Sequence, residues 1–159
     1  MRISSVSDNK GNRIGLPLGE VRKPLVPSEE QILDGHYCYL ESLDAEKHSA
    51  DLFAAYALDT EGQLWTYMPQ GPFENESQYR SWVEGAQHKA DPFFYAIIDK
   101  GTNKAVGVAS YLRVDPNSSS IEVGWITFSP LIQQKPIATE SMYLMMKNAL
   151  EHYRKLFPD

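Results

Sequence analysis

Cysteine is almost absent from this sequence, because Cys38 is the only one in 159 residues. A single cysteine excludes an internal disulfide and indicates a reducing compartment. Cys38 lies in an alternating, strand-like segment, where we expect a buried and chemically inert thiol. Long apolar runs are missing as well: no segment reaches membrane-spanning length, and the first residues lack the apolar core of a signal peptide. We therefore expect a cytoplasmic protein without a membrane partner.

Positive charge is also scarce. The chain has 15 lysine and arginine residues against 21 aspartate and glutamate residues, which gives a formal net charge of −6 at pH 7. No basic stripe is present, and this argues against nucleic acid as a partner. A mildly acidic surface suits a cationic or amine-bearing substrate, but it also serves solubility alone, and composition leaves both interpretations open.

Several catalytic and metal-binding signatures are missing too. The four histidines are scattered, and neither an HExxH motif nor a zinc-type spacing of cysteine and histidine occurs, so we expect no metal. The sequence also lacks a GxSxG nucleophile elbow and a phosphate-binding P-loop. These absences argue against a zinc enzyme, a serine hydrolase with that elbow and a P-loop NTPase.

What the sequence does contain is the pattern of one ordinary domain. Residues 1–35 carry glycine, proline and charges without a sustained period, which predicts an extended N-terminal arm. The apolar spacing of the remainder predicts, in order, a strand at 36–43, helices at 44–59 and 74–89, strands at 93–99, 105–115 and 120–128, and a helix ending near 157. Hairpin-length turns join the last three strands, so they should be antiparallel neighbours. The order predicts an α/β or α+β domain of three layers, with helices flanking a mostly antiparallel central sheet.

The segment between the last strand and the last helix, FSPLIQQKPIATESMYLMM, has the features of an anion site. Pro136 suits the first helical position, and a helix start leaves backbone N–H groups unpaired at the positive end of its dipole. We expect free donors at Lys135, Ile137 and Ala138. Phosphate or pyrophosphate fits such a cradle. The alternative is that proline and threonine serve only to begin the helix.

The longer stretch IEVGWITFSPLIQQKPIATESMYLMM resembles the fourth strand, the pyrophosphate loop and the third helix of the GNAT superfamily of acetyl-CoA-dependent N-acetyltransferases. It is most similar to the branch that resembles ribosomal-protein N-terminal acetyltransferases. The family loop has the form Gln/Arg-x-x-Gly-x-Gly/Ala, which maps here to Gln133, to Pro136 in place of the first glycine, and to Ala138. The likeness extends along almost the whole chain, since GHYCYLESLDAEKHSADLFAAYA is similar to the first strand and helix, and FFYAIIDKGTNKAVGVASYLRVD to the next two strands.

The resemblance implies an enzyme that transfers an acetyl group from acetyl-CoA, its co-substrate, to a primary amine of a small molecule or of a protein N-terminus. Backbone groups of Ile126, Thr127 and Phe128 would hold the pantetheine arm. The amides implied for pyrophosphate binding are those of Gln133, Gln134, Lys135, Ile137, Ala138 and Thr139. The amine would attack the thioester carbonyl directly, while a backbone amide of the strand polarises the carbonyl oxygen.

The resemblance also suggests residues on the acceptor side. Glu122 lies in the fourth strand, where several relatives keep a glutamate that acts as a base through water. The alternative is a strand carboxylate that pairs with arginine or faces solvent. Trp65, Tyr67 and Phe73 lie in the loop that would overhang the acceptor groove, either as substrate contacts or as packing of that loop. The methionines of the last helix, expected in the core because of their helical spacing, are Met142, Met145 and Met146.

In the family, the chain continues after this helix with a fifth strand, a fourth helix and closing strands, which often include a tyrosine that protonates the leaving thiolate. This sequence ends at LEHYRKLFPD, so we expect residues 36–159 to be the N-terminal part of an acyl-CoA N-acyltransferase domain, lacking the C-terminal strands and helix. An open sheet edge at 121–128 then predicts a homodimer or a swapped assembly. The alternative function is a non-catalytic remnant of the fold that binds CoA or serves as an interaction module.

Overall fold

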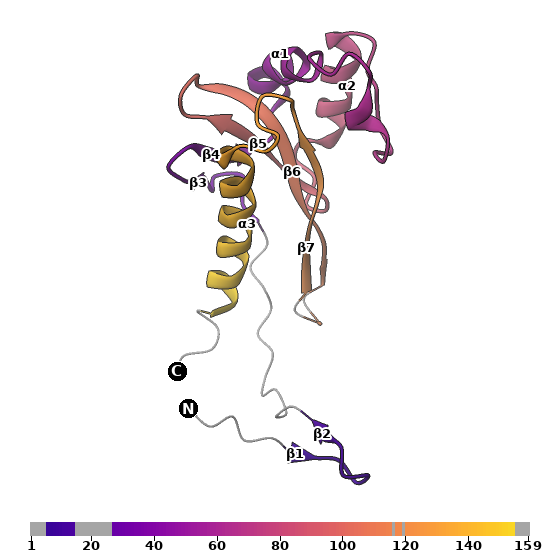
Figure 1. Cartoon of the computed structure of the whole chain (residues 1–159), viewed down its shortest axis with the longest axis vertical. Coiled ribbons are helices and arrows are strands. Elements are labelled where there is room, and N and C mark those ends of the chain that lie inside the picture. The colour runs from indigo at the N-terminus through magenta and orange to yellow at the C-terminus, as the bar shows by residue number, and fades with distance from the viewer. Residues whose placement is uncertain (1–5, 15–26, 116, 119, 155–159) are drawn as a thin grey trace.

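The computed structural model describes residues 6–14, 27–115, 117–118 and 120–154 of the chain (Figure 1). Its centre is a five-stranded antiparallel sheet in which every strand pairs with the next one along the chain. The strands are β3 (Leu33–Asp34), β4 (Cys38–Ser42), β5 (Phe93–Asp99), β6 (Lys104–Asp115) and β7 (Ser120–Phe128). Because β7 follows β6 at the end of the order, its other side has no strand partner among the described residues.

The helices begin where the sequence supplies a suitable first residue. Asp44 precedes α1 (Ala45–Tyr56), and Asn75 precedes α2 (Glu76–Ala86); each side chain accepts a hydrogen bond from the backbone N–H three residues later, at 2.8 and 3.0 Å. The third helix, α3 (Pro136–Arg154), starts at the predicted proline. No helix among the described residues has both the length and the apolarity needed to cross a membrane.

Two hydrophobic clusters hold three layers together. On one face of the sheet, α1 and α2 contribute Leu52 and Val83 to a cluster that includes Ile98 of β5. On the other face, α3 contributes Met145 to a cluster that includes Ile97 of β5. Figure 1 shows the same arrangement, with α3 on the opposite side of the sheet from the other two helices. β5 is buried on both faces, which explains why its sequence is apolar throughout rather than alternating. The predicted fold class is confirmed.

The described part of the predicted N-terminal arm contains short strands. β1 (Val6–Ser7) and β2 (Arg13–Ile14) pair with each other in a two-stranded hairpin. The last residues of the arm form β3, which belongs to the main sheet. Residues 1–5 and 15–26 of the predicted arm lie outside the described residues, and the boundary at residue 35 stays a prediction.

The methionines of α3 do not all lie in the core. Met145 is fully buried and Met142 packs, half-buried, against the same cluster, but 52% of the surface of Met146 is exposed. The prediction was wrong for Met146 because adjacent helical residues point about 100° apart, so residues 145 and 146 cannot both face the sheet. Tyr143 and Leu150 are exposed on α3 as well.

Candidate functional site

A β-bulge interrupts the pairing of β7 with β6. Ser110 pairs with Gly124 and Val108 pairs with Thr127, so two residues of β7, Trp125 and Ile126, lie opposite a single residue of β6. Trp125 adopts the left-handed conformation, with φ of 49°, although it is not glycine. A bulge bends its strand and turns backbone groups out of the regular ladder. The edge strand of the sheet is therefore kinked shortly before it ends.

The residues that follow the bulge are anchored by side chains. The Tyr56 hydroxyl of α1 donates to the Thr127 carbonyl oxygen at 3.1 Å, and the Gln133 side-chain amide donates to the Phe128 carbonyl oxygen at 3.1 Å. Ile126 is 38% exposed. Of the three residues predicted to hold a pantetheine arm, Ile126 is thus the most open, while Thr127 and Phe128 already have a protein donor at their carbonyls.

The loop between β7 and α3 folds into consecutive tight turns, and these turns use several of the amides predicted to be free. The Gln133 amide donates to the Ser129 carbonyl oxygen at 3.2 Å, and the Lys135 and Ala138 amides donate to the carbonyl oxygens three residues before them, at 3.1 Å each. The prediction of free donors at Lys135 and Ala138 was wrong, because turn formation satisfies these N–H groups locally. It holds for Ile137.

Two amides of this loop keep their donors free. Those of Gln134 and Ile137 have no acceptor within the described part of the chain, whereas Thr139 is the fourth residue of α3, where the N–H begins the intrahelical hydrogen bonds. Gln134 adopts the left-handed conformation, with φ of 58°, which turns the backbone immediately before the helix start. The Lys135 side chain is exposed and makes no ion pair with a described residue. The start of α3 therefore offers free N–H groups, the positive end of a helix dipole and a mobile cation in one place.

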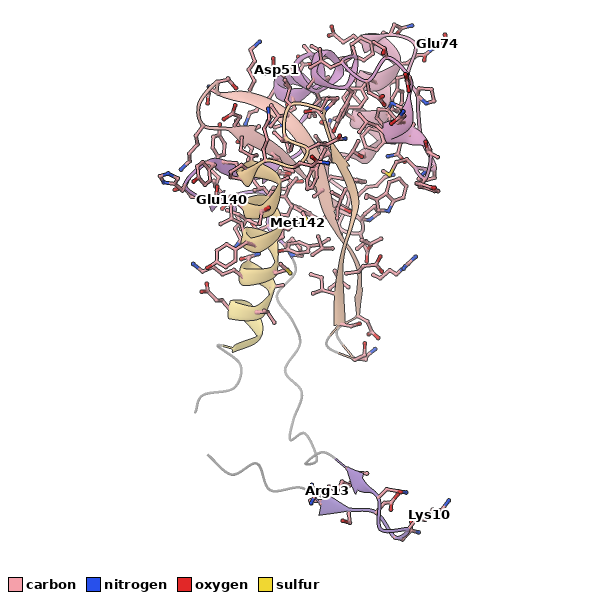
Figure 2. The ribbon with its side chains drawn as sticks, in the orientation of Figure 1. Lys10, Arg13, Asp51, Glu74, Glu140 and Met142 are labelled. Atoms are coloured by element: carbon pink, nitrogen blue, oxygen red, sulfur yellow. The ribbon has the colours of Figure 1, made fainter. Side chains whose placement is uncertain are left out.

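Glu140 fixes the start of α3 against the sheet (Figure 2). Its carboxylate accepts hydrogen bonds from the backbone N–H groups of His36, Tyr37 and Cys38, at 2.7, 2.7 and 2.9 Å. Partial burial raises the pKa of Glu140, but these amides and the Cys38 thiol outweigh burial, so the net pKa is lowered. Gly35 leaves room for the carboxylate, since a Cβ there would lie 2.7 Å from the Glu140 carboxyl carbon.

The loop after α1 forms an aromatic pocket together with α2. Trp65, at the end of the short helix η1 (Gln63–Trp65), packs edge-to-face on Phe73 with ring centres 5.3 Å apart, and both side chains line the pocket. Tyr67 does not take part, because 96% of its surface is exposed. The predicted overhanging loop thus places two of its three aromatic residues in one cavity and leaves the third in solvent.

The family model for the acetyltransferase (GNAT) domain matches residues 39–156. This range covers the sheet from β4 to β7, all three helices and the loop at the start of α3. The chain belongs to the GNAT acetyltransferase family. The bulged edge strand and the loop with free amides both lie within the matched range.

Solved structures agree with the family assignment. This GNAT chain is 34% identical to a GCN5-related N-acetyltransferase from Brucella melitensis, with a TM-score of 0.78 over 82% of its own length and 58% of the other chain. It is 30% identical to a probable acetyltransferase of the GNAT family from Chromobacterium violaceum, with a TM-score of 0.76 over 85% and 67% of the two chains. It therefore spans less than two thirds of the length of the Brucella protein.

A more distant neighbour shares the fold alone. The ribosomal L7/L12 α-N-protein acetyltransferase RimL, in complex with coenzyme A, matches with 18% identity and a TM-score of 0.58, over 74% of this chain and 67% of the other. No match was found among curated proteins.

Glu122 lies on β7 before the bulge. Its carboxylate accepts a hydrogen bond from the Arg113 guanidinium at 2.7 Å, and 46% of its side chain is exposed. Arg113 itself sits at a second bulge, on β6, where its backbone N–H and that of Val114 both donate to the Asp91 carboxylate at 3.0 Å. The arginine-paired carboxylate considered as the alternative is thus the geometry found. The role of Glu122 as a base stays a prediction.

Two other ionisable side chains, those of Cys38 and His48, are buried in the protein. Cys38 is fully buried, and burial, with the nearby Glu140 carboxylate, raises the pKa of its thiol to about 12, so it is not a nucleophile at neutral pH. His48 is buried and bonds to the Glu41 carboxylate at 2.9 Å. Within the described ranges, no group of three or more His, Cys, Asp or Glu side chains could hold a metal ion.

Sequence reasoning missed the roles of Glu140, Tyr56 and Tyr79. Glu140 looked like an ordinary polar residue of a helix, since its partners lie more than a hundred positions earlier. Tyr56 and Tyr79 lie in the two helices predicted at 44–59 and 74–89, where apolar spacing alone gave them no separate role. Their hydroxyls were the available signal, because a buried tyrosine hydroxyl requires a hydrogen-bond partner.

Proposed function

We propose that this GNAT domain binds acetyl-CoA and transfers its acetyl group to the nitrogen of a primary amine. The observation that carries the proposal is the continuity of the bulged edge strand with the loop at the start of α3. A single stretch of chain, from Trp125 to Ile137, offers an open strand edge followed by free N–H groups at a helix start. Acetyl-CoA carries matching groups in the same order. Its extended arm has amide groups that suit the strand edge, and its pyrophosphate suits the free N–H groups at the helix start.

In this proposal, the anionic part of acetyl-CoA lies at the amides of Gln134 and Ile137, with Lys135 supplying a positive charge. The pantetheine arm runs along β7 past Ile126, and the thioester lies at the bulge, where a backbone N–H turned out of the ladder can polarise the carbonyl oxygen. The substrate amine attacks the thioester carbon, the carbon–sulfur bond breaks, and the nitrogen loses one proton while the sulfur leaves as thiolate or thiol.

Glu122 is the residue of this chain proposed to receive the amine proton through water. We expect Glu122→Gln to change the free energy of unfolding by less than about 1 kcal/mol, because its ion pair with Arg113 is exposed. We expect the same change to lower kcat/KM for acetyl transfer by about a hundredfold, the lower range for general base catalysis. Unchanged kcat/KM over the full pH profile would assign Glu122 a purely structural role.

The test of the CoA site uses Thr139, whose side chain is exposed in the first turn of α3, beside the free amides. Aspartate in the first turn of a helix favours folding, so Thr139→Asp should not lower the melting temperature. The same charge opposes a bound pyrophosphate, and we expect the Kd for CoA to rise by about ten- to a hundredfold. Calorimetric titration with CoA measures the effect, and Thr139→Asn is the uncharged control of similar shape.

The proposal predicts near wild-type CoA affinity for Thr139→Asn and a large loss only for Thr139→Asp. Protection of residues 134–139 from amide hydrogen exchange by CoA should accompany binding. Equal Kd values for the two variants, or no CoA binding by the wild-type chain, would contradict this placement of the pyrophosphate.

A further inference from the structure

A cavity of about 410 Å³ lies between the C-terminal end of α1, the η1 turn and the start of α2. Four aromatic side chains that line it pack edge-to-face on one another, with ring centres 5.2–5.7 Å apart. These side chains are Tyr56, Trp65, Phe73 and Tyr79. Aromatic rings present negative potential at their faces, and several rings around one cavity form a recognised setting for a cation.

Three carboxylates also line this cavity, and none is neutralised by a described cationic side chain. Asp59, Glu61 and Glu74 accept hydrogen bonds only from neutral donors, namely the Leu64 backbone N–H at 2.7 Å and the side-chain amides of nearby glutamines at 2.6 and 3.2 Å. No lysine, arginine or histidine lines the cavity. Glu74 lies at the outer corner of the molecule, on the loop before α2 (Figure 2). The aromatic cavity therefore has uncompensated negative charge at its wall.

The Tyr79 hydroxyl is a separate indication of a ligand. Tyr79 is 1% exposed and lines the cavity, and its hydroxyl makes no hydrogen bond of acceptable geometry with a described residue, although the Tyr56 hydroxyl lies beside it. The neighbouring Tyr56 hydroxyl already donates its proton to the Thr127 carbonyl oxygen. A buried hydroxyl without a partner costs free energy, and its oxygen can accept a hydrogen bond from a bound N–H group.

We propose that this cavity binds a protonated amino group of the acceptor, and that the acceptor is a linear diamine or polyamine. This inference rests on the proposed function. Carboxylates and aromatic faces favour the charged form of an amine, and a protonated amine has no free electron pair with which to attack a thioester. The amino group held in the cavity is therefore the distal one, and a second amino group of the same molecule reacts.

The position of Tyr56 connects the cavity with the reaction site. This side chain lines the cavity and also touches Thr127, which directly follows the bulge of β7. A flexible aliphatic chain between two amino groups would let one group stay in the cavity while the other reaches the bulge. A neutral apolar ligand would leave the negative charge of the carboxylates uncompensated, and an anion would be repelled by them.

The test compares cadaverine, a linear diamine, with pentanediol, which has the same carbon chain and no charge. Calorimetric titration of the full chain should give a Kd for cadaverine at least about tenfold lower than that for pentanediol. The double variant Glu61→Gln/Glu74→Gln should raise the Kd for cadaverine by about tenfold. Glu76→Gln is the matched control, since Glu76 is an exposed carboxylate that does not line the cavity, and it should change the Kd by less than about twofold.

Tyr79→Phe is a second test. It changes no charge, so it tests the hydroxyl separately from the carboxylates. It removes only the hydroxyl, which makes no hydrogen bond of acceptable geometry, so it should keep the melting temperature of the wild type while raising the Kd for cadaverine by about threefold or more. An unchanged Kd in Tyr79→Phe, equal affinities for cadaverine and pentanediol, or an equal loss in Glu76→Gln would each overturn the proposal.

CoA titrations of the same variants separate this inference from the proposed function. The cavity variants should bind CoA as the wild type does, because they leave the start of α3 unchanged. CoA binding without cadaverine binding would overturn the diamine site alone. Cadaverine binding without CoA binding would overturn the proposed acetyl transfer and leave a cation-binding cavity.

Discussion

Replacing Glu140 by alanine should lower the free energy of unfolding by about 2–3 kcal/mol at neutral pH. The change removes the acceptor of three backbone N–H groups at the start of β4. Water can reach the amides of His36 and Tyr37, which are exposed in part, so the loss stays below the sum of three buried bonds. Chemical denaturation measures the effect. Glu151→Ala, on the exposed side of the same helix, is the control and should cost less than about 0.5 kcal/mol.

The Glu140 contribution should also depend on pH. The carboxylate has a lowered pKa in the folded chain, so its contribution is fully present above the pKa of an unfolded glutamate, about 4.3. The contribution is lost as pH falls through the lower folded pKa. The difference in stability between wild type and Glu140→Ala should therefore be constant near pH 7 and shrink below about pH 4. A difference that persists unchanged at pH 3 would contradict this account.

Replacing Met145 by alanine should cost about 2–5 kcal/mol, whereas the same change at Met146 should cost less than about 1 kcal/mol. Met145 is fully buried between α3 and the sheet, and Met146 is 52% exposed one residue later. The pair compares identical side chains on one helix, so helix propensity cancels. Urea denaturation of both variants measures the difference, and equal losses would mean that α3 is rotated relative to the sheet.

The architecture could be predicted from the sequence because it depends on local patterns. The spacing of apolar residues places helices and strands, hairpin-length turns make the last three strands antiparallel, and Pro136 marks the start of α3. The stretch at 121–146, through its resemblance to the strand, loop and helix of a known family, indicated the GNAT family. These features need only residues that are close along the chain.

The tertiary structure alone decided which groups are free to bind a ligand. The turns of residues 129–138 consume the Lys135 and Ala138 amides and leave those of Gln134 and Ile137, a result that depends on φ and ψ angles rather than on residue type. The bulge at Trp125 could not be foreseen either, because a non-glycine residue with positive φ breaks the local preference and is imposed by the pairing of β6 with β7.

The features that could not be predicted from the sequence are those that depend on contacts between residues far apart in the chain. The sequence by itself determined the layers of the domain, its antiparallel strand order and the position of the loop at the start of α3. Only the fold showed that the Glu140 carboxylate accepts hydrogen bonds from amides about a hundred residues away. Only the fold showed that Tyr79 shares a cavity with carboxylates that have no cationic partner among the described residues. The reason is physical: periodicity encodes which face of an element is buried, but hydrogen-bond partners and cavities depend on how elements distant in the chain pack together.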